Sequence, residues 1–431
     1  MESWAKWKRT IYIVSGLIIM SLIFLSNDDI RDAATPTFSA TRKGRLLPWN
    51  ELPKGPDGEY IDNLSDAQCD FAFPDLYHEI DRATSYWKQR NHNITKEDVS
   101  VDWFHSAFRL LIHKNQIRIL ESKNAFGSAM SRARCMDITF LLHRSLESAT
   151  AAGEILPTVE LAFTIPDITE MPNDTTHTAL TWNRRINDTN HERHWMIPNF
   201  SMWRGDGDLS YPESRIAAKK MDLPFVKKIP KLVWRGAVWV NHVRAALASA
   251  TKDKPWADVE KVAGEDGKEF YLSNDDLCKY AMTVHTEGIS YSARLDWLIE
   301  CNSLLFIHEL EWDMWYYHLL KSSGPEQNYV PVRRDFSDLE EKVKYYLENP
   351  DEAERVIQNS IETFRERYLT RAAVSCYFRR LLRGYAEVAF VPEVERMGKS
   401  EGRLLRGVPY EMFMIGTKDF GDRDSYLETE R

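Results

Sequence analysis

The sequence predicts an α/β protein, and three observations lead to that prediction. From Lys231 to Trp312 the hydrophobic pattern changes period in the order strand, helix, strand, helix, strand. The apolar strand runs stop abruptly near the polar residues Arg235, His285 and Glu309. Hydrophobic residues make up 43% of the 431-residue chain, enough to bury a core. Ligands of open α/β sheets bind outside the carboxyl ends of the strands, where these polar residues are expected.

The N-terminal segment is expected to be a membrane anchor. Residues 11–25 are almost wholly apolar, with three basic residues before them and two aspartates soon after. This run is short for a membrane span, which usually needs ~20 residues, so a cleaved signal peptide is the alternative. The charge asymmetry favours an uncleaved signal anchor at residues 10–26. Residues 1–9 are then a cytosolic tail, and residues 27–60 form a stem.

The rest of the chain is expected to face the lumen of the secretory pathway. Five glycosylation sequons agree with that location, at Asn63, Asn93, Asn173, Asn187 and Asn199. The net charge of −9 argues against a general nucleic-acid binder. The spacing of the five cysteines does not decide between reduced thiols and two cystines.

Further elements are predicted outside the central stretch. They are helices at residues 103–121, 131–148, 337–347 and 351–367, a last helix capped by Thr370, and a strand at residues 159–165. Residues 171–208 are polar and turn-rich, as expected of a long lid or crossing loop.

Asp167 is the candidate general base. It follows the strand at residues 159–165 and so lies at a strand's carboxyl end. A carboxylate there can accept the proton of an attacking hydroxyl. The alternative interpretation is a turn-forming residue after Pro166.

Arg235 and Arg294 are the candidate anion ligands, because both lie near strand ends and a phosphate is the natural ligand of two guanidinium groups. Either arginine could instead belong to a structural ion pair. Arg294, however, falls in the first turns of a predicted helix, where a cation is unfavourable to the helix dipole. That local conflict favours a functional role.

Asp206 and Asp208 are alternative candidates, for a divalent metal. They flank a glycine in a turn, where aspartate is common for backbone reasons. The sequence has no dinucleotide G-x-G-x-x-G motif, no P-loop and no H-E-x-x-H zinc motif.

Several stretches together resemble glycosyltransferase family 90, which contains the protein O-glucosyltransferases and capsule-associated xylosyltransferase-like proteins. The spacing is most similar to the fungal branch, and the match runs roughly from residue 159 to 388. The stretches are Leu232-Val-Trp-Arg-Gly236, His285-Thr-Glu-Gly288, Ser290-Tyr-Ser-Ala-Arg294, Cys301-Asn-Ser303, Glu311-Trp312, Asn328-Tyr-Val-Pro-Val332 and Cys376-Tyr377.

The resemblance implies the GT-B arrangement, in which two Rossmann-like domains face a cleft. The domains are an N-terminal acceptor domain (61–224) and a C-terminal nucleotide-sugar domain (225–392), followed by a tail (393–431). It implies inverting transfer of xylose or glucose from a UDP-sugar to a hydroxyl on a protein or polysaccharide. It also implies lumenal residence. Together with the anchor expected from the flanking charges, this predicts a single-pass type II protein of the Golgi or endoplasmic reticulum membrane.

The resemblance implies residue roles as well. Asp167 matches the catalytic base. The UDP-sugar-binding residues are expected to be Arg235, Gly236, Ser290, Ser292, Arg294 and Asp335. Cys278 and Cys301 match a family cystine, and Cys69 with Cys376 is a second expected pair, which leaves Cys135 free. With two fixed cations at the leaving group, a metal cofactor is not required.

Two other interpretations stay open. One is a non-catalytic carbohydrate-binding module. The other is a metal-dependent transferase that uses Asp206 and Asp208. The resemblance is weakest after Asp167 and over residues 199–208, on the expected acceptor side, so the acceptor is the least defined part of the prediction.

Overall fold

The computed structural model describes residues 46–169, 176–204, 209–262, 270–397 and 402–416. The predicted cytosolic tail and membrane anchor lie outside these residues. So do most of the stem, Asn173, Asp206 and Asp208. Within the described ranges, no helix is both long enough and apolar enough to cross a membrane.

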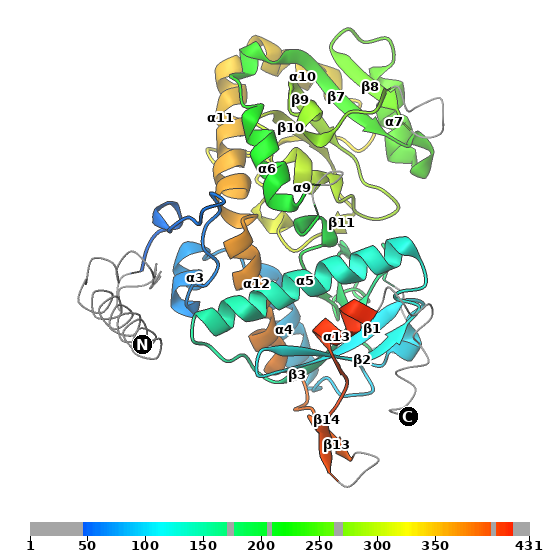
Figure 1. Cartoon of the computed structure of the whole chain (residues 1–431). Coiled ribbons are helices and arrows are strands. Elements are labelled where there is room, and N and C mark those ends of the chain that lie inside the picture. Colours follow the sequence, from blue (N-terminus) through cyan, green and yellow to red (C-terminus); the bar gives the residue numbers. More distant parts are fainter. Residues whose placement is uncertain (1–45, 170–175, 205–208, 263–269, 398–401, 417–431) are drawn as a thin grey trace, which may run out of the picture. The chain divides into compact units, whose positions relative to one another are not determined.

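The central stretch forms a parallel sheet, as the α/β prediction requires (Figure 1). Its strands, in spatial order, are β12 (Val330–Val332), β10 (Leu304–His308), β9 (Tyr280–His285), β7 (Ile229–Gly236) and β8 (Ala257–Lys261). All neighbouring pairs run parallel. The chain leaves β7 toward β8 and then returns to β9 on the other side of β7, so the strand order reverses between β7 and β9. Such a switch point is where open α/β sheets bind ligands.

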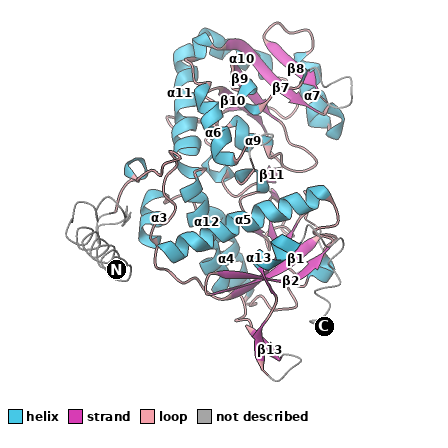
Figure 2. Ribbon diagram, viewed as in Figure 1, coloured by secondary structure: helices cyan, strands magenta, loops and turns pink. Residues whose placement is uncertain are grey.

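Helices alternate with these strands and cover the sheets (Figure 2). The helices are α3 (Asp66–Ala72), α4 (His78–Arg90), α5 (Ala129–Ala151), α6 (Tyr211–Lys220), α7 (His242–Thr251), α8 (Asn274–Leu277), α9 (Arg294–Leu298), α10 (Leu339–Glu348), α11 (Pro350–Ser360), α12 (Arg371–Ala386) and α13 (Tyr410–Gly416). A π-helical segment, Ile361–Tyr368, continues α11. Thr370 caps α12 by accepting a hydrogen bond from Ala373 N, as predicted.

The second large sheet is mixed. Its order is β15 (Val408–Pro409), β2 (Gln116–Lys123), β1 (Ala107–His113), β3 (Val159–Thr164), β4 (Leu180–Thr181) and β6 (Trp195–Met196). Antiparallel pairs join β15, β2, β1 and β3, and parallel pairs join β3, β4 and β6. The strand predicted before Asp167 is confirmed as β3. Two short sheets pair β5 (Arg184–Arg185) with β11 (Trp312–Asp313), and β13 (Glu395–Met397) with β14 (Arg403–Leu405).

The helix predicted at residues 103–121 is wrong, because this segment is the β1–β2 hairpin. Lys114 and Asn115 both adopt positive φ angles, 51° and 59°, as a two-residue hairpin turn requires. Asn tolerates this conformation, so Asn115 is the residue whose presence could have indicated a turn here. The predicted lid at 171–208 also contains short strands, which place part of it in the mixed sheet.

Two large hydrophobic cores flank the sheets. One packs around the mixed sheet and α12 and extends to one face of the parallel sheet through Val233, Leu305 and Ile307. The other packs the opposite face of the parallel sheet against α7, α10 and α11. The α/β class is therefore confirmed. The predicted domain boundaries stay predictions.

The C-terminal segment completes the mixed sheet. The carboxylate of Glu160, on β3, is fully buried between Arg109 Nη1 and Arg406 Nη1, each at 2.8 Å. Arg118 donates to the carbonyl oxygens of Arg406 and Gly407, next to β15. Ion pairs and backbone hydrogen bonds thus hold this C-terminal segment, whose sequence predicted no element, to the mixed sheet.

We expect Glu160→Gln to destabilise the fold by about 3 kcal/mol, because it leaves two arginines without their shared buried carboxylate. Urea unfolding monitored by circular dichroism measures this change. Glu395→Gln, on the exposed β13, is the matched control and should change the free energy of unfolding by less than about 0.5 kcal/mol. Equal stability of Glu160→Gln and the wild type would contradict the role given to this cluster.

Both expected disulfides are present. Cys278 is bonded to Cys301 across the β9–α9 unit, and Cys69 on α3 is bonded to Cys376 on α12. Cys135 is a free, buried thiol on α5.

Candidate functional site

Asp167 lies three residues beyond the end of β3, and its side chain is 37% exposed. Arg134 Nη1, from the start of α5, lies 2.9 Å from Asp167 Oδ1. The Arg134 guanidinium is itself held by the Ile165 carbonyl oxygen and by stacking on Phe200. Asp167 is therefore a half-exposed carboxylate aimed by a fixed cation.

A short loop after β9 connects Asp167 to the parallel sheet. Ser290 Oγ donates to the backbone oxygen of Asp167 at 2.7 Å, and Asn183 Nδ2 donates to the same oxygen at 2.8 Å. The neighbouring hydroxyl of Tyr291 is buried, and its pKa is raised by burial and then by the charge of Asp167. The loop that leads from β9 to Arg294 therefore passes beside the candidate base.

Arg294 and Arg244 form a pair of cations at the switch point. Arg294 opens α9 after β9, and Arg244 lies in the first turn of α7 after β7. Both guanidinium groups lie over Trp234, with Cζ 5.6 Å from the ring centre for Arg294 and 5.8 Å for Arg244. Arg244 donates to the backbone oxygens of Glu287 and Ala237. No carboxylate of the described ranges forms an ion pair with either arginine, and Arg294 Nη1 is buried without a partner there.

The electrostatics of this pair favour an anion. Burial and, as the second cause, the neighbouring charge of Arg244 together lower the pKa of Arg294 to about 10. Burial also lowers the pKa of Arg244. Both groups stay charged at neutral pH, and two close, partly desolvated cations without a carboxylate are costly unless an anion joins them.

His285, at the end of β9, is a third polar group of this cluster. It is fully buried, and neither ring nitrogen has a partner among the described residues. Burial, followed by the charges of His308, Arg294 and Arg244, holds its pKa well below the usual value. The ring is therefore neutral and can both donate and accept a hydrogen bond.

Arg235, the other predicted diphosphate ligand, contacts a different set of groups in the structure. Its Nη2 lies 2.7 Å from Asp258 Oδ1, on the adjacent strand β8. Its Nε donates to the Phe270 carbonyl oxygen, and its Nη1 donates to the carbonyl oxygens of Trp234 and Asp258. These bonds occupy the guanidinium, which favours the alternative interpretation of Arg235 as half of a structural ion pair.

Of the other predicted donor-binding residues, Gly236 lies next to the cation pair and Asp335 does not. A Cβ atom at Gly236 would lie 3.2 Å from Arg294 Nη1 and 2.7 Å from the Trp234 ring, so glycine leaves room for both. Ser292 is partly exposed on the loop before Arg294. Asp335 is exposed and accepts a hydrogen bond from Ser337 N, as a turn residue does, which argues against its predicted role.

Glu287 and His308 hold the loop after β9 in place. Glu287 N donates to His308 Nε2 at 3.0 Å, and His308 Nδ1 lies 2.7 Å from the Glu309 carbonyl oxygen. Nδ1 must therefore carry the proton, and Nε2 must be free to accept. Burial, as the largest cause, lowers the pKa of His308 from 6.5 to about 4.

This arrangement predicts a pH dependence of stability. Because the folded pKa of His308 is below the unfolded value, the neutral ring stabilises the fold above pH 6.5, and this stabilisation is lost as the pH falls toward 4. We expect the urea midpoint to fall over this range. The urea midpoint of His308→Gln should fall less steeply over this pH range, because glutamine cannot be protonated. Identical pH profiles for the two proteins would rule out His308 as the cause.

The four sequons in the described ranges differ in exposure. Asn93 and Asn187 are exposed, and Asn63 is partly exposed. Asn199 is fully buried, and its Nδ2 donates to Asp296 Oδ2 at 2.6 Å. The folded structure therefore has no room for a glycan at Asn199, which corrects that prediction.

Two residues of this candidate site were not predicted from the sequence. Arg244 had the same signal as Arg294, a cation in the first turn of a helix that follows a strand. Arg134 had none, because it continues an ordinary helical pattern and meets Asp167 through the fold alone.

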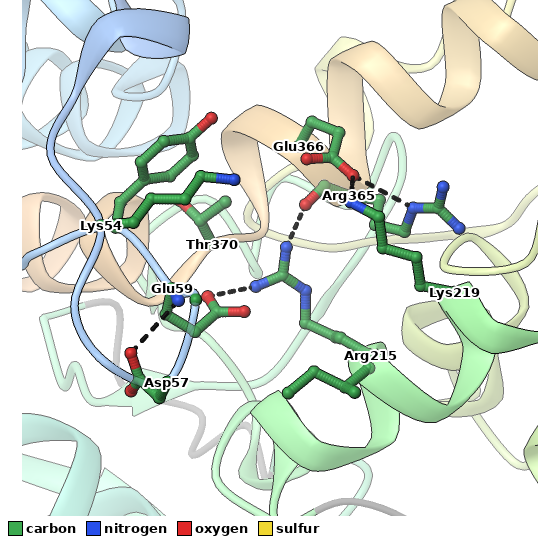
Figure 3. Close-up of a pocket in the computed structure, with 11 residues that line it drawn as sticks. Lys54, Asp57, Glu59, Arg215, Lys219, Arg365, Glu366 and Thr370 are labelled. Atoms are coloured by element: carbon green, nitrogen blue, oxygen red, sulfur yellow. Dashed lines mark hydrogen bonds and ion pairs between the residues drawn. The ribbon is translucent and has the colours of Figure 1, made fainter.

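A cavity of about 200 Å³ lies among other residues, between the segment 54–60, α6 and the π-helical segment (Figure 3). Arg215 is buried there and pairs with Glu59 at 2.5 Å and Glu300 at 3.2 Å. Lys219 pairs with Glu366 at 3.1 Å. Carboxylates pair with these two buried or helix-borne cations, and Lys54, which also lines the cavity, lies over the Tyr60 ring.

Comparisons with known proteins identify the relatives of this chain. The family model for glycosyl transferase family 90 matches residues 67–400. The chain is 28% identical over 217 residues to an O-glucosyltransferase rumi homolog of Aedes aegypti, covering 45% of this chain and 52% of that protein. It is 25% identical over 256 residues to protein O-glucosyltransferase 1 of Rattus norvegicus, covering 54% and 63%.

A bacterial relative, O-glucosyltransferase LpsA of Dichelobacter nodosus, is 30% identical over 142 residues, covering 32% of this chain and 44% of that protein. The chain thus spans less than two thirds of the length of these relatives. The family model covers most of the described residues, including Asp167, Arg244 and Arg294. The chain belongs to glycosyl transferase family 90.

Proposed function

We propose that the chain transfers a sugar from a UDP-sugar to a hydroxyl group of a protein acceptor, with inversion at the anomeric carbon. The observation that carries the proposal is the loop after β9. Ser290, in the middle of this loop, is hydrogen-bonded to the backbone of Asp167, and the loop leads to Arg294 of the cation pair. A base and an anion site are thus joined through a few residues. Relatives named O-glucosyltransferases support glucose as the sugar, with xylose as the alternative.

The reaction needs a base and charge stabilisation. Asp167 accepts the proton of the acceptor hydroxyl, whose oxygen then bonds to the anomeric carbon on the face opposite the diphosphate. The bond from that carbon to the diphosphate oxygen breaks, and its electron pair leaves with UDP. Arg244 and Arg294 stabilise the negative charge that develops on the leaving group, usually the largest catalytic contribution of such a site.

Each remaining group has a part in this proposal. Arg134 aims the Asp167 carboxylate, and neutral His285 supplies a hydrogen bond beside the diphosphate. The two guanidinium groups offer the charge that a divalent metal would otherwise supply, so metal is not required. The parallel sheet and the mixed sheet would be the two Rossmann-like halves of a GT-B enzyme, with the donor bound at the parallel sheet.

We propose a type II membrane protein whose catalytic part faces the lumen of the Golgi or endoplasmic reticulum. Two disulfides support an oxidising compartment, and the exposed Asn93 and Asn187 sequons support lumenal glycosylation. Protease protection in intact microsomes, combined with endoglycosidase treatment, tests this location.

UDP release by the purified full chain tests the function. UDP-glucose, UDP-xylose and UDP-galactose are each incubated with a panel of secreted protein domains and, separately, with free glycans. We expect acceptor-dependent release with UDP-glucose that persists in excess chelator. UDP binding without transfer to any acceptor would instead favour a carbohydrate-binding module. Loss of transfer in chelator would favour the metal mechanism with Asp206 and Asp208.

A further inference from the structure

Residues 216–231 have a composition unlike the rest of the chain. They contain five lysines and one aspartate, whereas the whole chain has a net charge of −9. The segment runs from the second half of α6, through a turn and a short 3-10 helix, Phe225–Lys227, into the start of β7. A basic segment in an acidic protein indicates a surface selected for an anionic partner.

Aliphatic side chains are exposed on the same segment. Ile216 is 41% exposed, Leu223 49%, Val226 65% and Ile229 42%. A single exposed aliphatic residue is normal on a protein surface. Four within one short basic segment are not explained by packing, because Phe225 and Ala218 already supply its buried contacts.

The positive charge of the segment is largely unneutralised. Lys220, Lys227 and Lys231 are exposed and form no ion pair within the described ranges. The aspartate, Asp222, is bound by both terminal nitrogens of Arg365, at 2.9 and 2.7 Å, so it does not offset these lysines. Glu366 pairs with Lys219.

The remaining charged groups nearby do not change this balance. Lys228 is buried and donates to the Cys278 carbonyl oxygen and to Ser303. Glu354, from α11, is half-buried and accepts a hydrogen bond from Phe225 N. Lys279, which precedes β9 and meets the backbone of Ile229, pairs with Asp276.

Secondary structure places the two kinds of side chain together. Ile216, Lys219 and Lys220 are three and four residues apart on α6, so they share a helix face. Ile229 and Lys231 are two residues apart on β7, so they share a strand face. Aliphatic groups beside uncompensated lysines match an interface of anionic headgroups over hydrocarbon, whereas an acidic polypeptide would not need the aliphatic groups.

We propose that residues 216–231 rest on an anionic lipid surface, with Leu223, Val226 and Ile229 at the headgroup boundary and Lys220, Lys227 and Lys231 beside phosphates. This proposal does not depend on the transfer reaction. It gives the folded part of the chain a membrane contact of its own, which would fix its orientation on the bilayer.

A fluorescent label at this surface tests the proposal in the full chain. Val226→Cys is labelled with an environment-sensitive fluorophore, which reacts there because Cys135 is buried and the other four cysteines are in disulfides. The labelled chain is reconstituted with phosphatidylcholine vesicles, with or without phosphatidylserine. We expect a blue shift with phosphatidylserine that high salt abolishes.

Matched variants separate this surface from general charge effects. Lys220→Glu, Lys227→Glu and Lys231→Glu together should abolish the blue shift. The same change at exposed Lys96, Lys252 and Lys321 should leave it intact. A fluorophore attached at Lys252→Cys should report an aqueous environment with both kinds of vesicle. A label at residue 226 that reports the same environment with both lipid mixtures overturns the proposal, as does a blue shift produced by an acidic peptide but not by vesicles.

Discussion

Asp167→Asn is expected to lose sugar transfer by about 10²–10⁴-fold while it keeps its affinity for UDP. The substitution removes the proton acceptor and little else. An asparagine oxygen can still accept from Arg134, which lies 2.9 Å from the present carboxylate. The backbone oxygen of residue 167 still accepts from Ser290 and Asn183. Transfer rate, UDP affinity by calorimetry and the melting temperature are the three measurements.

The exposed Asp253→Asn is the matched control, since it makes the same chemical change on the surface. It should change none of the three quantities. An Asp167→Asn variant that transfers sugar at nearly the wild-type rate would show that another group is the base. A variant that also loses UDP affinity would show that Asp167 helps to hold the donor.

The sequence predicted the parallel half of the fold better than the mixed half. Strands β9 and β10 and the second half of β7 are largely apolar, buried runs that end at polar residues, a pattern typical of buried parallel strands. The β1–β2 hairpin was mistaken for a helix because its burial does not alternate cleanly; β1 is buried at five of its seven positions. A strand buried on both faces loses the period of two that identifies it.

The candidate site could be assembled from the sequence only in part, for a similar reason. Arg294 and Asp167 are recognisable from position alone, because strand ends and helix starts are visible in sequence. The choice between Arg235 and Arg244 as the second anion ligand cannot be made from position, because it depends on which side chain pairs with a carboxylate. Arg235 meets Asp258 on the neighbouring strand, and no carboxylate of the described residues pairs with Arg244. The pairing of β7 with β8 brings Asp258 beside Arg235, and the sequence does not show this pairing.

Arg244→Gln and Arg294→Gln are each expected to weaken UDP binding by about 10–100-fold, because a charge-assisted hydrogen bond contributes about 1.5–3 kcal/mol. Transfer should fall as well, since the same contact stabilises the leaving group. Affinity for uridine, which has no phosphate, should be unchanged. Calorimetry with UDP and uridine on the same preparations measures both.

Arg244→Gln and Arg294→Gln should not lower the stability of the fold, although they weaken UDP binding. Each of these arginines is a partly buried cation beside a like charge, and no carboxylate of the described ranges pairs with it. Its removal should therefore leave the melting temperature without UDP unchanged or raise it. Arg235→Gln should show the reverse, a lower melting temperature with unchanged UDP affinity, because it breaks the ion pair with Asp258. If Arg235→Gln weakened UDP binding and the other two variants did not, the diphosphate would lie at the β7–β8 pair.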